Sequence, residues 1–268
     1  MTFSAKWCTF CMDISIKSSN FVVDMRNLPI VTRYLLIANF VIFLLTSLLQ
    51  GLGVDLNFLC GLHYFSAPTF HFWQPLTYMF LHANLGHILC NMLAVWMFGA
   101  TIEREWGAER YIVYYIVCGL GAGLVQELVW SLMAIPPSYL PYLNTIGASG
   151  AVFGILFAFG WLYPDLPLYL FFIPVPIRAR IFVTIYAAIE LFAGLGSMAG
   201  FTSDNIAHFA HLGGLLFGWL LILWWKHINW REPRIFEWWR RLQSKKHRRL
   251  DDADEEDRFK DYHYQKRV

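Results

Sequence analysis

The chain has 268 residues, of which 57% are hydrophobic and only 15% are charged, with a formal net charge of +2. Soluble domains average about 25% charged residues, so this composition argues against a soluble domain and indicates a polytopic membrane protein. The five cysteines are odd in number and scattered, which argues against a disulfide framework.

Residues 1–24 show no strong pattern, and Met25 is a candidate for the true start of the chain. Six apolar stretches follow, and most approach the ~20 residues that a membrane-spanning helix needs. They lie near residues 34–52, 87–102, 111–133, 149–162, 181–198 and 206–225. We therefore predict an all-α fold, in which a six-transmembrane-helix bundle at 33–226 follows an N-terminal segment at 1–32 and precedes a tail at 227–268.

Basic residues orient this bundle. Of the 21 Lys and Arg residues, 13 lie from Lys226 onward, and the other eight precede the first span or lie between spans two and three or four and five. The remaining connections, 53–86, 134–148 and 199–205, contain none. By the positive-inside rule, both termini are expected to be cytoplasmic, and the ends of the spans at Ser149 and His211 face outward.

The fourth span is too short to cross the whole bilayer. Residues 149–162 make 14 residues of helix, or roughly 21 Å at 1.5 Å per residue, whereas the hydrocarbon core is about 30 Å thick. Ser149 should therefore lie below the outer headgroups. Non-helical chain at that depth is tolerated only inside protein or beside a water-filled cavity, so the length predicts a wet pocket with a serine at its floor.

Small residues recur every four positions in spans four and six. Gly150 and Gly154 form one such row, and Ala210, Gly214 and Gly218 form another. Rows of this kind let two helix backbones approach closely, which would bring the neighbouring serine and histidine together. Packing alone is the alternative explanation of these rows.

A serine needs a base to become a nucleophile, and a neutral histidine suits that role. His211 lies on the small-residue face of its helix, one turn before Gly214, and is favoured, whereas His208 is expected to line the pocket or to form hydrogen bonds. We predict a dyad of Ser149 and His211 without an acid, because Asp204 lies in a loop and Glu190 lies in the middle of span five, with no evident reason to reach His211.

A third polar group lies at the outer end of span two. His87 and Asn91 are four residues apart, so they share one face of a helix. Such side-chain donors, together with the backbone N–H of Ser149 at a helix N-terminus, can stabilise an oxyanion. We expect His82 to hold the external loop by hydrogen bonds.

Two metal-site interpretations are disfavoured. Cys8 and Cys11 have the spacing of zinc ligands but lack a second pair. A site made by four histidines lacks both the His-Glu-x-x-His motif and a nearby carboxylate, so we expect no metal and no cofactor. These histidines are His82, His87, His208 and His211.

Taken together, these motifs resemble the rhomboid intramembrane serine proteases of the six-helix, bacterial type. The matching motifs are His-x4-His-x3-Asn at 82–91, Gly-x-Ser-Gly at 147–150 and Ala-His-x-x-Gly-x3-Gly at 210–218, and the likeness covers about residues 30–226. The resemblance implies that Ser149 is the nucleophile and His211 the base, with His87 and Asn91 in the oxyanion hole. It gives supporting roles to residues within the same motifs, namely His82, Gly147, Gly150 and His208.

The resemblance also implies how such a protein would act. It would cleave transmembrane proteins within the bilayer, in a bacterial inner membrane, near the outer ends of their helices. Its aromatic first external loop would be partly embedded, and span five would be a lateral gate. The Trp-Arg pair common in that loop is absent from 53–86, so the loop must be anchored differently. A non-proteolytic relative that binds membrane helices is the alternative, and a transporter is third.

The tail alternates aromatic and basic residues from 230 to 241, then becomes acidic at 251–257. The first part is typical of an interfacial helix on an anionic leaflet, and the second of a solvated segment. A nucleic-acid partner has little support, because the basic run is short and follows a membrane span directly.

Overall fold

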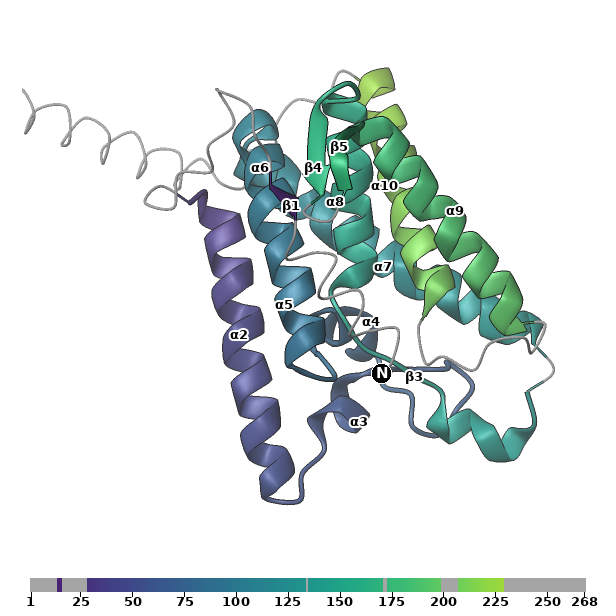
Figure 1. Cartoon of the computed structure of the whole chain (residues 1–268). Helices are drawn as coiled ribbons and strands as arrows, with labels where there is room; N and C mark the ends of the chain where they lie inside the picture. The colour runs from purple at the N-terminus through teal and green to yellow at the C-terminus, as the bar shows by residue number, and fades with distance from the viewer. Residues whose placement is uncertain (1–13, 16–27, 134, 171–172, 199–206, 229–268) are drawn as a thin grey trace, which may run out of the picture. The chain divides into compact units, whose positions relative to one another are not determined.

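The computed structural model describes residues 14–15, 28–133, 135–170, 173–198 and 207–228. Within these ranges, five helical stretches are long and apolar enough to cross a membrane, and α8 (Ser149–Leu162) is apolar but shorter (Figure 1). The long stretches are α2 (Ile30–Gly51), Leu85–Trp106, α7 (Ala108–Leu132), α9 (Ala179–Met198) and α10 (His208–Ile228). The predicted all-α membrane bundle is therefore confirmed, with one helix over each predicted apolar stretch.

The second span changes its helical form midway. α5 (Leu85–Ala94) passes into a π-helical turn, η3 (Val95–Gly99), and then into α6 (Ala100–Trp106). A Cβ added at Gly99 would overlap the hydroxyl of Tyr111, so the turn brings the backbone of this span directly against α7. The span ends at Gly107, whose φ of 81° lets the chain reverse into α7.

Glu103 of α6 fastens the start of α2. One carboxylate oxygen accepts the N–H of Val31 at 2.8 Å. The other accepts the N–H of Thr32 at 2.7 Å and its hydroxyl at 2.8 Å. The first N–H groups of a helix have no partner within it, and they favour a negative charge. Glu103 therefore acts as a helix cap supplied by a neighbouring helix.

The first connection, residues 52–84, is folded against the bundle. It contains α3 (Leu56–Cys60), β2 (Leu62–His63), α4 (Gln74–Thr77) and η2 (Tyr78–Phe80). β2 pairs antiparallel with β3 (Asn144–Thr145), which ties this connection to the segment before α8. Whether the connection is partly embedded in the membrane stays a prediction.

The fully buried Gln74 anchors this connection in place of the missing Trp-Arg pair. Its amide oxygen accepts the N–H groups of His63 and His71, at 3.3 and 3.1 Å. Its amide nitrogen donates to the carbonyls of Leu59 and Thr69, at 3.3 and 3.0 Å. This one side chain thus forms hydrogen bonds with four backbone groups of the loop.

Glu127 of α7 adds a link from the bundle to the loop. Its carboxylate accepts the N–H of Phe65 at 2.9 Å. Glu127 is therefore a hydrogen-bonding residue that joins α7 to the first connection.

A β-hairpin between α8 and α9 was not predicted. It consists of β4 (Pro167–Leu170) and β5 (Ile173–Arg178), and β1 (Ile14–Ser15) pairs with β4 on its other side. Asp165 pairs with Arg180 at 2.9 Å and with Arg178 at 3.7 Å. All three side chains are more than half exposed, so these pairs add little stability.

A six-residue 3-10 helix, η4 (Pro137–Tyr142), precedes β3 on the way to α8. The predicted interfacial helix and acidic segment of the tail, and the loop holding Asp204, lie outside the described residues.

Candidate active site

Ser149 and His211 meet at the ends of two helices. Ser149 is the first residue of α8, and His211 lies in the first turn of α10. The Nε2 atom of His211 is 2.8 Å from the Oγ atom of Ser149, a hydrogen-bond distance across which a hydroxyl proton can be transferred. The His211 side chain is 12% exposed, so the pair is largely shielded but reachable.

Glycine residues in α8 and α10 allow the two helices to approach closely enough for Ser149 and His211 to meet. A Cβ added at Gly214 would overlap the backbone carbonyl of Gly150, so α8 and α10 touch backbone to backbone directly after Ser149 and one turn after His211. The predicted contact is confirmed for these two residues, and also for Gly154 and Ala210: a Cβ at Gly154 would lie 3.2 Å from the carbonyl of Gly214, and one at Gly150 would lie 3.5 Å from the carbonyl of Ala210. It was wrong for Gly218, which faces Tyr114 and Cys118 of α7 instead. Two crossing helices stay in contact over a short length only, and beyond the crossing α10 packs on α7.

Phe153 fixes the plane of the His211 ring. The two rings are stacked, with centroids 4.3 Å apart and planes 8° from parallel. Tyr186 of α9 packs against Phe153, with a centroid distance of 4.6 Å. Sequence reasoning missed this wall of the site, although Phe153 lies one helical turn after Ser149 on the same helix and could have been found from that spacing.

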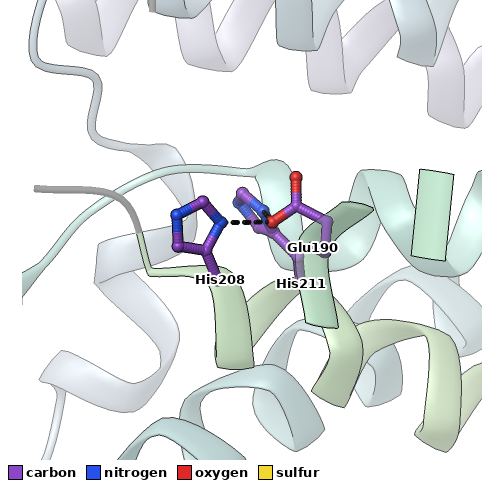
Figure 2. Close-up of side chains that lie close together, drawn as sticks. All are labelled: Glu190, His208 and His211. Carbon is purple, nitrogen blue, oxygen red and sulfur yellow. Dashed lines mark hydrogen bonds and ion pairs between the residues drawn. The ribbon is translucent and has the colours of Figure 1, made fainter. Parts of the chain in front are cut away.

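Glu190 reaches His211, contrary to the prediction that it has no reason to do so. Its Oε2 atom accepts a hydrogen bond from the Nδ1 atom of His211 at 2.9 Å and from the Nδ1 atom of His208 at 2.7 Å (Figure 2). The residue is 2% exposed. A carboxylate in an apolar span needs partners, and the two histidines of the next helix are the donors that could have indicated this contact.

This contact determines which ring nitrogen of His211 carries the proton. A carboxylate only accepts hydrogen bonds, so the Nδ1 atom that faces Glu190 must be the protonated one. The Nε2 atom then has a free lone pair, and that lone pair faces Ser149. His211 is thus held in the tautomer that a general base requires.

His208 is buried, 3% exposed, and donates to the same carboxylate oxygen. Among the described residues, the hydrogen-bond partner of Ser149 is His211 and not His208. The placement agrees with the prediction that His208 is a hydrogen-bonding residue.

Glu190, His208 and His211 also have the composition of a metal site. Their three donor atoms lie within 4.8 Å of one another, so the expectation that no carboxylate lies near these histidines was wrong. Ligand atoms around a tetrahedral zinc ion, each ~2.0–2.1 Å from it, would lie about 3.3 Å apart. The observed separations of 2.7 and 2.9 Å are hydrogen-bond distances. Hydrogen bonding therefore accounts for the cluster, and absence of a metal stays a prediction.

His87 reaches the serine across Gly147. The side chain of Asn84 caps α5 by accepting the N–H of His87 at 2.9 Å. The Nδ1 atom of the His87 ring accepts the N–H of Ala83 at 3.4 Å, which leaves the proton on Nε2. A Cβ added at Gly147 would lie 2.8 Å from this Nε2 atom and 3.4 Å from the Ser149 Oγ atom. The His87 N–H and the Ser149 hydroxyl therefore border the same glycine.

Asn91 lies one turn further along α5 and carries a buried hydrogen-bond donor. It is 5% exposed, and its buried Nδ2 atom has no hydrogen-bond partner among the residues that the structure describes. Leaving a buried donor unpaired costs about 1–3 kcal/mol, which favours a group that acquires a partner during function.

His82 packs edge-on against His87, with ring centroids 5.0 Å apart. Burial, together with the neighbouring His87, lowers the pKa of His82 to about 3, so this ring is neutral at physiological pH. It therefore packs against His87 without adding a positive charge to the site. Both ring nitrogens of His82 are without a hydrogen-bond partner among the described residues, so the expected hydrogen bonds from His82 to the external loop are not found.

Comparison with known proteins agrees with this arrangement. A Rhomboid domain matches residues 69–226, more than half of the chain. Rhomboid protease GluP of Bacillus subtilis is 31% identical over 146 residues, which cover 54% of this chain and 24% of GluP. RHOMBOID-like protein 12, mitochondrial, of Arabidopsis thaliana is 31% identical over 193 residues, 67% of this chain and 54% of that protein. Rhomboid-like protein 11, chloroplastic, of Arabidopsis thaliana is 30% identical over 197 residues, which cover 70% of this chain and 63% of that protein. The chain thus spans less than two thirds of each of these relatives. The chain belongs to the rhomboid family of polytopic membrane proteins.

Proposed function

We propose that this protein is an intramembrane serine endopeptidase that cleaves transmembrane helices of other membrane proteins near their outer ends. The observation that carries the proposal is the 2.8 Å contact between the Ser149 Oγ and His211 Nε2 atoms, at the ends of two apolar helices. Membership in a family that includes a relative named as a protease supports it.

The reaction follows from the geometry of this pair. His211 takes the hydroxyl proton through Nε2 while the Ser149 oxygen attacks the carbonyl carbon of the scissile peptide bond. The resulting imidazolium returns that proton to the leaving amine, and an acyl-enzyme remains. A water molecule, deprotonated by His211, then hydrolyses the ester and regenerates Ser149.

Three donors are available for the oxyanion that forms in each half of the reaction. They are the ring N–H of His87, the Nδ2 atom of Asn91 and the backbone N–H of Ser149. Ser149 is the first residue of α8, so its N–H has no carbonyl within the helix to bond. Donors fixed before the charge develops need no reorganisation during the reaction.

The depth of the serine restricts the substrate. α8 spans 14 residues, or roughly 21 Å, so its N-terminal serine lies inside a hydrocarbon core about 30 Å thick. A helical substrate pairs all its backbone groups internally. It must therefore unwind locally to expose a carbonyl, which favours substrates with small or helix-breaking residues near the outer membrane surface.

The basic residues support one orientation. In the proposed arrangement, both termini are cytoplasmic and the active site opens to the outer side of a bacterial inner membrane.

Cleavage of a single-span substrate in liposomes tests the proposal. We expect Ser149→Ala and His211→Ala to lose activity by about 10⁴-fold or more, whereas His208→Ala retains most of it. Ser131→Ala is the matched control. Ser131 is exposed on α7, and its hydroxyl donates only to a carbonyl of the same helix, so this variant should behave as wild type.

A fluorophosphonate probe separates this proposal from the alternative of a non-proteolytic helix-binding relative. Labelling that disappears in Ser149→Ala supports the protease. Substrate co-purification without labelling supports the binding protein. Full cleavage by Ser149→Ala would end the protease hypothesis.

A further inference from the structure

α9 has few buried residues compared with the other helices around the site. Four of its 20 residues are buried, and they are Ala179, Phe182, Glu190 and Gly194. Most of its other large apolar side chains are exposed, with Ile185 and Phe192 being 51% and 71% exposed. In a membrane protein such a surface faces lipid, and lipid contact does not hold one helix against another. The polar contact of Glu190 is therefore a large part of what joins α9 to α10.

A second close approach lies one turn after Glu190. A Cβ added at Gly194 would lie 3.0 Å from the ring of Phe209 and 3.2 Å from the Cβ atom of His208. The absence of a side chain at Gly194 lets α9 approach α10 closely enough for the carboxylate to reach both histidines. The docking of α9 and the hydrogen bonds of Glu190 are thus parts of one contact.

The same contact serves the proposed base. An anionic carboxylate that is 2% exposed is costly unless it is paired, and His208 and His211 supply two N–H donors to one of its oxygens. His208 holds that oxygen in place, and His211 is then held with its proton on Nδ1. When His211 accepts the serine proton, the adjacent carboxylate also stabilises the positive charge that forms.

We infer that Glu190 is a positioning residue for His211, and that the serine is activated only while α9 is docked on α10. The inference rests on the proposed serine-protease function. Separation of α9 from α10 removes the acceptor from His211 Nδ1, after which the ring can take the other tautomer and present a proton, rather than a lone pair, to Ser149.

Steady-state kinetics with a membrane substrate test the role of Glu190. We expect Glu190→Ala to lower kcat by about 10²- to 10⁴-fold, as for loss of an orienting acid elsewhere, with KM changed less than about threefold. Glu190→Gln keeps the size and one acceptor but loses the charge, so it should recover part of kcat. Leu191→Ala, on the next residue of the same helix and 42% exposed, is the control and should match wild type.

Nuclear magnetic resonance of ¹⁵N-histidine-labelled protein supplies a readout that a merely structural role would not change. His211 should show the Nδ1–H tautomer in the wild type and a mixture in Glu190→Ala. If Glu190→Ala does not fold, the same kinetic and resonance measurements on Glu190→Gln test the inference. Wild-type kcat and an unchanged tautomer in a folded Glu190 variant overturn the inference.

A double-mutant cycle tests the coupling to docking. The side chain added in Gly194→Val should push α9 away from α10 and lower kcat. The same change made in the Glu190→Ala background should lower kcat little further, because each change removes the same contact between α9 and α10. Effects that multiply would show that docking and positioning are independent, which overturns the coupling. If Ser149→Ala remains fully active, the proposed function fails as well. If Ser149→Ala is inactive and Glu190→Ala is not impaired, this inference alone fails.

Discussion

Gly147→Ala adds one methyl group where three parts of the site meet. The N–H of Gly147 donates to the carbonyl of Tyr78 at 2.9 Å, which fixes the backbone before α8. Its φ is 136°, a conformation that residues with a Cβ rarely adopt. The added Cβ would lie 2.8 Å from two atoms of the His87 ring, closer than real Cβ contacts allow. Either the backbone or the ring must move.

The size of the effect has two parts. Holding a non-glycine residue in this backbone region costs about 1–3 kcal/mol, which should appear as lost stability. Displacing the His87 ring removes one donor from the proposed oxyanion hole, and loss of one such donor elsewhere costs about 10²–10³ in kcat. We therefore expect Gly147→Ala to lower both the unfolding temperature and kcat, with kcat reduced by about two to three orders of magnitude.

Two other glycines separate these causes. Gly53 also has a positive φ, 86°, but a Cβ there meets nothing within 4 Å among the described atoms. Gly53→Ala should therefore lose stability while keeping kcat. Gly51 has neither constraint, so Gly51→Ala should be close to neutral in both assays. Thermal unfolding in detergent and cleavage kinetics measure the two effects. Wild-type kcat in Gly147→Ala, or an equal loss of kcat in Gly53→Ala, would refute the reasoning.

Further variants test the scaffold. Gln74→Leu removes the partner of four buried or partly buried backbone groups, so it should lower stability by about 2–4 kcal/mol in thermal unfolding. Gly214→Ala forces the backbones of α8 and α10 apart at Gly150, which should cost about 1–3 kcal/mol and weaken fluorophosphonate labelling; unchanged labelling would contradict it. Glu103→Gln keeps one acceptor for the first turn of α2 but loses the other and the charge, so the unfolding temperature should fall while KM stays the same.

The parts of the site that could be predicted depend on local sequence. Ser149 begins a helix, and Gly150 and Gly214 belong to rows of small residues that determine where two backbones can touch. Each feature is visible within a few residues of its own helix. The Glu190 contact depends instead on how α9 lies against α10, which no periodicity within either helix encodes. Phe153 is an intermediate case, because its spacing from Ser149 is local to α8 whereas its partner ring, His211, comes from another helix.

The connections between helices were harder to predict for a different reason. Gln74 is one polar residue in an aromatic loop, and its role appears only when four backbone groups distant in sequence gather around it. The β4–β5 hairpin was not predicted, and Pro174 and Pro176 in its second strand are residues that argue against a strand. Proline lacks an N–H to donate, but β5 lies at the edge of its sheet, where this is tolerated.

The distribution of burial assigns different mechanical roles to the helices of the site. α8 carries Ser149 and Phe153 and has ten buried residues out of 14, whereas α9 carries Glu190 and has four out of 20. The proposed nucleophile and the ring that stacks on His211 therefore belong to the helix of the site with the largest buried share, and the carboxylate that contacts His211 belongs to a loosely packed one. Displacing α9 costs far less packing than displacing α8. In the proposed mechanism, a change in lipid or an approaching substrate helix would consequently alter the orientation of His211 before it altered the position of Ser149.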